Sequence, residues 1–171
     1  MSGRSRSSSP NRGGAGGTPA VTALTRLGID HTLLPYHHDP ASTAFGDEAV
    51  AALGRTPDEV FKTLVAELDG KLVVGVVPVS HQLDLKALAA ALGGKKAVMA
   101  KVADAERSSG YVAGGISPLG QKRALPTVVD ATAMDHERVL VSAGRRGLQV
   151  ELAPADLIRA MNATVSRISA A

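Results

Sequence analysis

The stretch from residue 62 to residue 79, KTLVAELDGKLVVGVVPV, carries the strongest structural signal in the sequence. Two valine-rich runs, residues 62–68 and 71–79, lie on either side of Asp69-Gly70. An Asp-Gly pair between two apolar runs is typical of a two-residue hairpin turn, because both of its positions favour a positive φ. The sequence therefore predicts an antiparallel β-hairpin with its turn at residues 69–70.

Helix and strand signals on both sides extend this hairpin to a domain. Thr18-Pro19 provides an N-cap and a first-turn proline for a helix whose apolar stripe is Val21, Leu24 and Leu27. We expect further helices at residues 47–53, 85–92, 103–109 and 154–161, and further strands at residues 32–37, 96–101, 127–130, 139–143 and 148–152. The sum is a single α+β domain, residues 18–171, with a curved, mixed and mostly antiparallel sheet, barrel-like in shape, flanked by helices.

Composition limits the possible functions. Aromatic residues make up 2% of the 171 residues, so Val, Leu, Ile and Ala must build the core. No apolar run is long enough to predict a membrane span. Cysteine is absent, which excludes disulfides, thiolate metal sites and a cysteine nucleophile, and fits a cytoplasmic protein.

The first 17 residues differ in composition from the rest of the chain. They are rich in Ser, Gly and Arg and contain no acid, so we expect residues 1–17 to form a disordered tail. Three arginines lie in this tail, and without them 16 basic residues face 16 acidic ones. Contacts with RNA would therefore need a local basic patch, and the candidates are Lys95, Lys96, Lys101, Lys122, Arg123, Arg145 and Arg146.

Common catalytic signatures are missing. Ser117 lies between glycines, but Pro118 follows it, and a nucleophile elbow needs an N–H donor at that position. His37-His38-Asp39 contains possible metal ligands, but adjacent strand residues point to opposite faces, so we expect no metal. No cofactor-binding fingerprint occurs in the predicted domain, and no cofactor is expected.

Three features remain as candidates for chemistry. Lys62 lies just inside a strand, where it is either an edge lysine in water or a cation in a pocket that could hold phosphate or a carbonyl. The loop at residues 114–120, GGISPLG, is either a structural turn or a set of unhindered N–H donors. Ser142 ends a predicted strand and belongs either to an ordinary hairpin or to a site.

Several of these segments occur together in one known family. The segments are Thr18-Pro19-Ala20-Val21, Tyr36-His37-His38-Asp39-Pro40, Phe45-Gly46-Asp47-Glu48-Ala49, Phe61-Lys62-Thr63-Leu64, Gln82-Leu83-Asp84-Leu85-Lys86, GGISPLGQ at residues 114–121 and VSAGRRGL at residues 141–148. In this order they resemble the YbaK/EbsC family of free-standing deacylases, related to the editing domain of bacterial prolyl-tRNA synthetases. The resemblance implies a small mixed α/β fold and removal of wrong amino acids, chiefly cysteine, from tRNA(Pro).

The resemblance also assigns roles to residues. It implies that Lys62, Gly115 and Ser142 are catalytic. It implies that the substrate is bound by Tyr36, Phe45, Thr63, Gly114, Ile116, Ser117 and Gln149. The close family pattern often has Asp where this chain has Gln149, so recognition of the substrate ammonium by an acid is not expected here. The implied partners are the aminoacylated 3′ end of tRNA and, transiently, prolyl-tRNA synthetase.

The missing nucleophile suits the mechanism that the resemblance implies, in which the substrate's own cysteine thiol attacks its ester. On this hypothesis, Lys62 and the Gly115 N–H stabilise the ester or its phosphate. Three alternatives stay open. The chain could be a deacylase for another amino acid such as alanine, a non-catalytic module that binds tRNA or the synthetase, or a metal hydrolase.

Overall fold

The computed structural model describes residues 17–171. The predicted tail, apart from Gly17, therefore lies outside the described residues. The α-helices are α1 (Pro19–Arg26), α2 (Phe45–Leu53), α3 (Leu85–Ala91), α4 (Val102–Ser109) and α5 (Pro154–Met161). A 3₁₀ helix spans Ala131–Asp135. The strands are β1 (Thr32–Pro35), β2 (Phe61–Leu68), β3 (Lys71–Pro78), β4 (Gln82–Leu83), β5 (Ala97–Met99), β6 (Thr127–Asp130), β7 (Val139–Arg145), β8 (Leu148–Leu152), β9 (Thr164–Ser166) and β10 (Ser169–Ala170).

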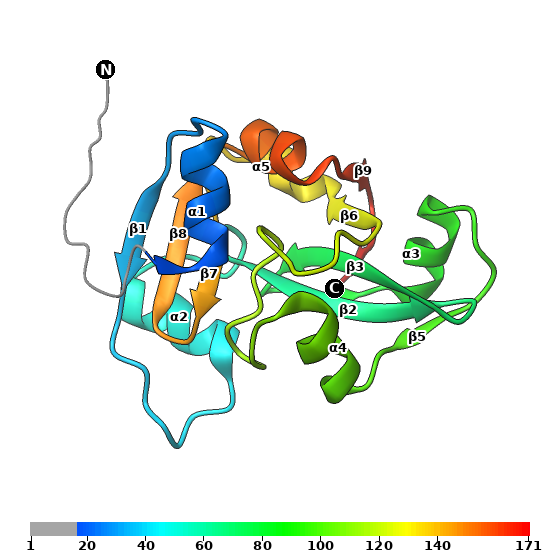
Figure 1. Cartoon of the computed structure of the whole chain (residues 1–171), viewed down its shortest axis with the longest axis horizontal. Helices are drawn as coiled ribbons and strands as arrows, with labels where there is room; N and C mark the ends of the chain where they lie inside the picture. Colours follow the sequence, from blue (N-terminus) through cyan, green and yellow to red (C-terminus); the bar gives the residue numbers. More distant parts are fainter. Residues whose placement is uncertain (1–16) are drawn as a thin grey trace.

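The predicted hairpin is the centre of the fold. β2 and β3 pair antiparallel along their full length, from Phe61 opposite Pro78 to Leu68 opposite Lys71. Asp69 and Gly70 both have positive φ, 50° and 86°, as a primed two-residue turn requires. The hairpin belongs to a five-stranded mixed sheet with the order β5-β2-β3-β6-β9, in which β3, β6 and β9 run parallel. Figure 1 shows the long β2–β3 ribbon crossing the molecule.

A second, antiparallel sheet with the order β1-β8-β7 lies beside α1 and α2 (Figure 1). A parallel bridge between Val60 and Leu140 joins it to the start of β2. A third pairing, β4 with β10, closes the C-terminal end. The strands of residues 17–171 thus form three sheets and no closed barrel, whereas the sequence predicted one curved sheet. The α+β class, the single domain and the predominance of antiparallel pairs are as predicted.

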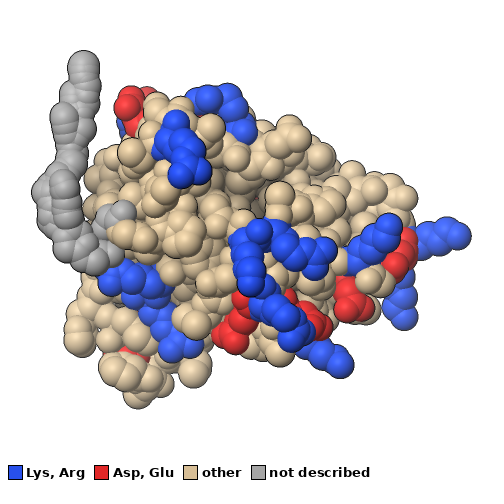
Figure 2. All heavy atoms as spheres, viewed as in Figure 1, with Lys and Arg blue, Asp and Glu red and all other residues tan. Residues whose placement is uncertain are grey.

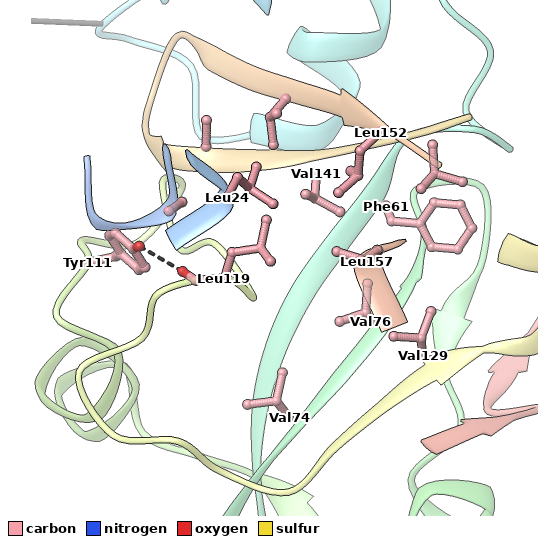
Figure 3. Packing of buried hydrophobic residues seen from close by; sticks show 14 of the residues in the cluster. Leu24, Phe61, Val74, Val76, Tyr111, Leu119, Val129, Val141, Leu152 and Leu157 are labelled. Carbon is pink, nitrogen blue, oxygen red and sulfur yellow. Dashed lines mark hydrogen bonds between the residues drawn. The ribbon is translucent and has the colours of Figure 1, made fainter. Parts of the chain in front are cut away.

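The core lies on both faces of the hairpin, which explains why its valine runs are nearly continuous. One cluster contains Phe61, Val74 and Val76 and packs against α1, α5 and the second sheet (Figure 3). Another contains Ala66 and Val77 and packs against α3. The predicted stripe of α1 is correct for two of its residues, but Leu27 follows the last helical residue and is 50% exposed.

The helices of residues 17–171 are short. None of them combines the length and the hydrophobicity that crossing a bilayer would require. The elements that the sequence analysis missed are the 3₁₀ helix and strands β4, β9 and β10, each of five residues or fewer. Such elements are too short to show a hydrophobic period, so tertiary contacts decide them.

Candidate active site

A cavity of about 340 Å³ opens beside the start of β2. It lies among β2, β7, β8, α2, α4 and the glycine loop, that is, segments from most of the chain. Seven of the predicted site residues line it, namely Phe45, Lys62, Thr63, Gly114, Ile116, Ser142 and Gln149. The structure therefore brings the predicted lysine and the predicted glycine loop to one hollow.

Lys62 is the basic residue in the lining of this cavity. It is half-buried, and its register partner across the hairpin is Val77. No carboxylate among residues 17–171 forms an ion pair with it. A cation beside a mostly apolar wall and without a counter-ion is available to an anionic or strongly polarised ligand.

Two buried oxygens in this lining have no hydrogen-bond partner among the described residues, Thr63 Oγ1 and Gln149 Oε1. Gln149 is 7% exposed and lies opposite Ser142 in the β7–β8 register. The Ser142 hydroxyl oxygen has a partner, because it accepts a hydrogen bond from the Gly144 N–H at 3.2 Å. Burying an unpaired polar oxygen costs free energy, so a ligand donor that reached either oxygen would relieve this cost.

Phe45, the first residue of α2, lines the cavity, and its ring is contacted by an arginine and by the glycine loop. The Arg146 guanidinium lies over this ring, 4.9 Å from its centroid, and its Nε donates to the Ala113 carbonyl at 2.8 Å. Gly114 has a φ of 86°, and a Cβ there would stand 2.7 Å from a ring carbon of Phe45. Only glycine satisfies both conditions without a shift of the loop or ring.

Gly115 is placed next to the cavity but has a different task from the expected one. Its N–H donates to the Val112 carbonyl at 2.9 Å, so this N–H is not free for a substrate. A Cβ at Gly115 would lie 2.7 Å from the Arg145 Cα. The residue therefore allows the loop to pack closely on the β7–β8 turn, and the mechanism that assigned its N–H to the ester does not fit this geometry.

Ser117 and Tyr36 also lie outside the lining. Ser117 is fully buried, and its hydroxyl accepts the Leu119 N–H at 3.2 Å, which shapes the loop. Tyr36 lies just after β1. Burial raises the pKa of its phenol, while hydrogen bonding with the Gly147 main chain and the Gln149 side chain opposes the rise. Tyr36 therefore approaches the cavity through Gln149 rather than from its wall.

The sequence analysis missed the apolar wall of the cavity. Val60, Val79, Ala100 and Ala105 contribute to it, and Met99 and Val102 form part of its rim. Met99 and Val102 are 49% and 62% exposed. Valine and alanine carry no chemical signature, so only the fold could reveal that these residues share a surface.

Basic residues gather near α4. Lys101 precedes this helix, and the N–H groups of Lys122 and Arg123 donate to the carbonyls of Ser109 and Ser108 at its end. Figure 2 shows Lys and Arg side chains grouped over this part of the visible face, with acids among them. Two other predicted members, Lys95 and Lys96, lie at the hairpin turn, where their N–H groups donate to the Asp69 carboxylate. The remaining two, Arg145 and Arg146, lie at the end of β7 and in the turn that follows it.

Of the adjacent residues His37 and His38, His38 contacts a carboxylate. His38 Nδ1 lies 2.7 Å from Glu48 Oε1, and this contact together with the Asp39 N–H lowers the pKa of Glu48. Within residues 17–171, no three His, Cys, Asp or Glu side chains come close enough to hold a metal ion.

Comparison with known proteins decides the family. The sequence profile described as "Aminoacyl-tRNA editing domain" matches residues 38–160. The chain belongs to the aminoacyl-tRNA editing domain family. A curated member, "Putative Cys-tRNA(Pro)/Cys-tRNA(Cys) deacylase EbsC" of Enterococcus faecalis, is 42% identical over 125 residues, which cover 71% of this chain and 76% of that protein.

Solved structures resemble this editing domain in fold. The crystal structure of a "putative trans-editing enzyme for prolyl tRNA synthetase" has a TM-score of 0.78 at 23% identity and covers 90% of this chain and 96% of its own. That of the "hypothetical protein APE2540" has a TM-score of 0.80 at 24% identity, with 89% and 99% covered. At these identities the similarity concerns the fold, which agrees with the predicted one.

Proposed function

We propose that this editing-domain protein removes cysteine from mischarged tRNA(Pro), acting in trans. The observation that supports this best is one small cavity lined by an unpaired lysine and two buried, unpartnered oxygens, in a chain of the editing family. An aminoacyl ester offers what these groups lack. Its carbonyl and the nearby phosphates attract an ammonium, and its α-ammonium is a donor for oxygen acceptors.

The reaction we propose uses the substrate's own thiol. The cysteine sulfur attacks the ester carbonyl carbon, so that an S–C bond forms and the C–O bond to the tRNA ribose breaks. The thiol proton ends on the released ribose oxygen, and the amino acid leaves as a cyclic thioester. The protein then needs to orient the substrate and stabilise charge, because it supplies no covalent group.

Each lining group has a part in this proposal. Lys62 stabilises the ester or its phosphate. Gln149 Oε1 and Thr63 Oγ1 accept hydrogen bonds from the α-ammonium, so a neutral amide serves where an acid would carry charge. Phe45 and the loop with Gly114 and Ile116 enclose the terminal ribose, with Ser142 at the strand end. Tyr36, Gly115 and Ser117 lie outside the lining and hold the lining residues in position.

The size of the cavity suits a small amino acid. A site that separates cysteine from proline by packing alone gains only about 1–3 kcal/mol per group, so an independent removal step is useful. The basic residues near α4 are our candidates for contacts with the acceptor end of tRNA. A transient complex with prolyl-tRNA synthetase in the cytoplasm would deliver the mischarged tRNA before it enters translation.

A panel of charged tRNAs tests the proposal. The purified protein and its Lys62→Ala variant are incubated with Cys-tRNA(Pro), Ala-tRNA(Pro), Cys-tRNA(Cys) and Ser-tRNA(Pro), and the remaining ester is measured over time. We expect rapid loss of the cysteinyl esters with wild type and slow loss of Ser-tRNA(Pro), because a hydroxyl is the poorer nucleophile. Faster loss of Ala-tRNA(Pro) than of Cys-tRNA(Pro) would refute the thiol mechanism, and no loss of any ester would refute the activity.

A further inference from the structure

The main chain at Thr63 lies on an unpaired stretch of strand edge. Across the hairpin, the Val79 N–H donates to the Val60 carbonyl at 2.8 Å. Because bonded pairs alternate along an antiparallel ladder, Lys62 and Leu64 also turn their N–H and C=O groups toward β3. Thr63, opposite Val76, is a non-bonded pair, so its N–H and C=O point away from β3.

The opposite edge of β2 is shared by two strands that diverge. At one end the Leu140 N–H, from β7, donates to the Glu59 carbonyl at 3.0 Å. At the other end the Ala100 N–H, just after β5, donates to the Val65 carbonyl at 3.1 Å. β5 itself pairs only with the last residues of β2, from Ala66 onward. On this edge, between the two attachments, no second strand of the described residues 17–171 pairs with Thr63.

The cavity fills the gap between the two strands. Thr63 and Ala100 line it from the β2 and β5 sides, and Ser142 lines it from β7. A main-chain N–H that is enclosed without a partner is costly, and nearly all such groups in proteins are bonded. Strand pairing supplies no acceptor to Thr63 on this edge, so an acceptor on a ligand can take that place.

The donor that the sequence suggested for this purpose is already used. Gly115 donates its N–H to Val112 at the far side of the loop. Thr63, in contrast, directly follows Lys62 in β2, so its N–H is next in the chain to the residue that carries the unpaired ammonium. A rigid strand holds such a donor in place before the substrate arrives, which is what stabilisation of a developing oxyanion requires.

We infer that the main-chain N–H of Thr63 is the oxyanion donor of this site. This inference rests on the proposed function and assigns the ester carbonyl a position in the gap between β5 and β7. When the thiolate adds to the carbonyl carbon, the negative charge that develops on the carbonyl oxygen is met by this N–H, with Lys62 beside it. The charge returns to the carbonyl when the bond to the ribose oxygen breaks.

A pair of variants with the same side chain, one with this N–H and one without it, tests the inference. Thr63→Val removes the hydroxyl and keeps the amide. The second variant carries 2-hydroxyisovaleric acid at position 63, the hydroxy-acid counterpart of valine, so an ester oxygen replaces the N–H. Single-turnover deacylation of Cys-tRNA(Pro) and thermal melting are measured for both. We expect the hydroxy-acid variant to react about 10²-fold more slowly than Thr63→Val, as for loss of one oxyanion-hole donor.

Both variants should stay folded at the assay temperature, although the hydroxy-acid variant should melt somewhat lower, because its ester makes the Lys62 carbonyl, which faces β3, a weaker acceptor. Equal rates within threefold would overturn the inference.

A binding measurement separates this inference from the proposed function. The inert probe is cysteine joined by an amide to 3′-amino-3′-deoxyadenosine, added to ¹⁵N-labelled wild-type protein. We expect the Thr63 amide resonance to shift among the largest in the spectrum. Shifts at Phe45 and Gly114 without one at Thr63 would overturn the inference even if deacylation is observed. Absence of both binding and deacylation would refute the proposed function and this inference together.

Discussion

The two ends of strand β2 are built from similar residues but serve different purposes. Residues 66–68, which we call the paired end, bond to β3 on one edge and to β5 on the other, and Ala66 and Leu68 are buried in the core. Residues 62–64, which we call the open segment, bond to β3 alone and border the cavity. Polar groups without partners therefore lie where β2 has no second neighbouring strand. The difference between the two ends indicates that the site arises from a gap in strand pairing.

The largest expected effect of a substitution is in the open segment. Lys62→Ala should slow deacylation of Cys-tRNA(Pro) by about 10²–10³-fold, because the developing charge loses its cation in a water-poor cavity. The matched control is Lys71→Ala, which removes an exposed lysine at the far end of the same hairpin. Single-turnover rates and thermal melts of both variants check this. Equal rates for the two would contradict the assignment of Lys62.

Substitution in the paired end should affect stability instead. Leu68→Ala removes a side chain that is 9% exposed and should lower the free energy of unfolding by about 2–4 kcal/mol. Val98→Ala, on the neighbouring β5, removes a side chain that is 43% exposed and should cost far less. Urea denaturation measures both. The rate per folded molecule should stay close to wild type in each variant, and a selective loss of rate at Leu68 would erase the distinction between the two ends.

The glycine loop offers a third test at the cavity mouth. Gly114→Ala combines a positive φ with a Cβ 2.7 Å from the Phe45 ring, so we expect a loss of about 1–3 kcal/mol in unfolding free energy and slower deacylation. Gly28→Ala is the control, because its φ is 68° but no atom lies within 4 Å of the added carbon. If Gly28→Ala is equally harmful in both assays, packing against Phe45 is not what Gly114 provides.

The smallest effect is expected at a buried, unpartnered oxygen. Gln149→Leu should change the free energy of unfolding by less than about 1 kcal/mol, because removal of a costly unpaired acceptor offsets the loss of hydrogen bonding between the Gln149 side chain and Tyr36, while deacylation slows. Gln121→Leu is the contrast, because that amide donates to the Ser117 carbonyl at 3.0 Å and its loss should destabilise. Denaturation curves and rates of both variants are needed. Destabilisation by Gln149→Leu as large as that by Gln121→Leu would mean that its oxygen also has a structural partner.

Predictions from sequence were accurate where the signal is local. The Asp69-Gly70 turn, the N-cap at Thr18 and the final helix from Pro154 all occur as expected. Each depends on conformational preferences of a few neighbouring residues. The resemblance to a family likewise located Lys62 and Gly114 on the cavity, although it assigned Gly115 an N–H that the loop itself uses.

The sequence by itself determined the hairpin, the positions of the helices to within about two residues, the apolar core and the absence of a cysteine nucleophile, because these follow from residue type and short-range spacing. The tertiary structure alone decided that β5 and β7 separate at Thr63, and that Gln149 and Thr63 keep buried oxygens without partners beside Lys62. Strand neighbours are chosen by packing among residues far apart in the chain, and no local pattern encodes which edge stays open.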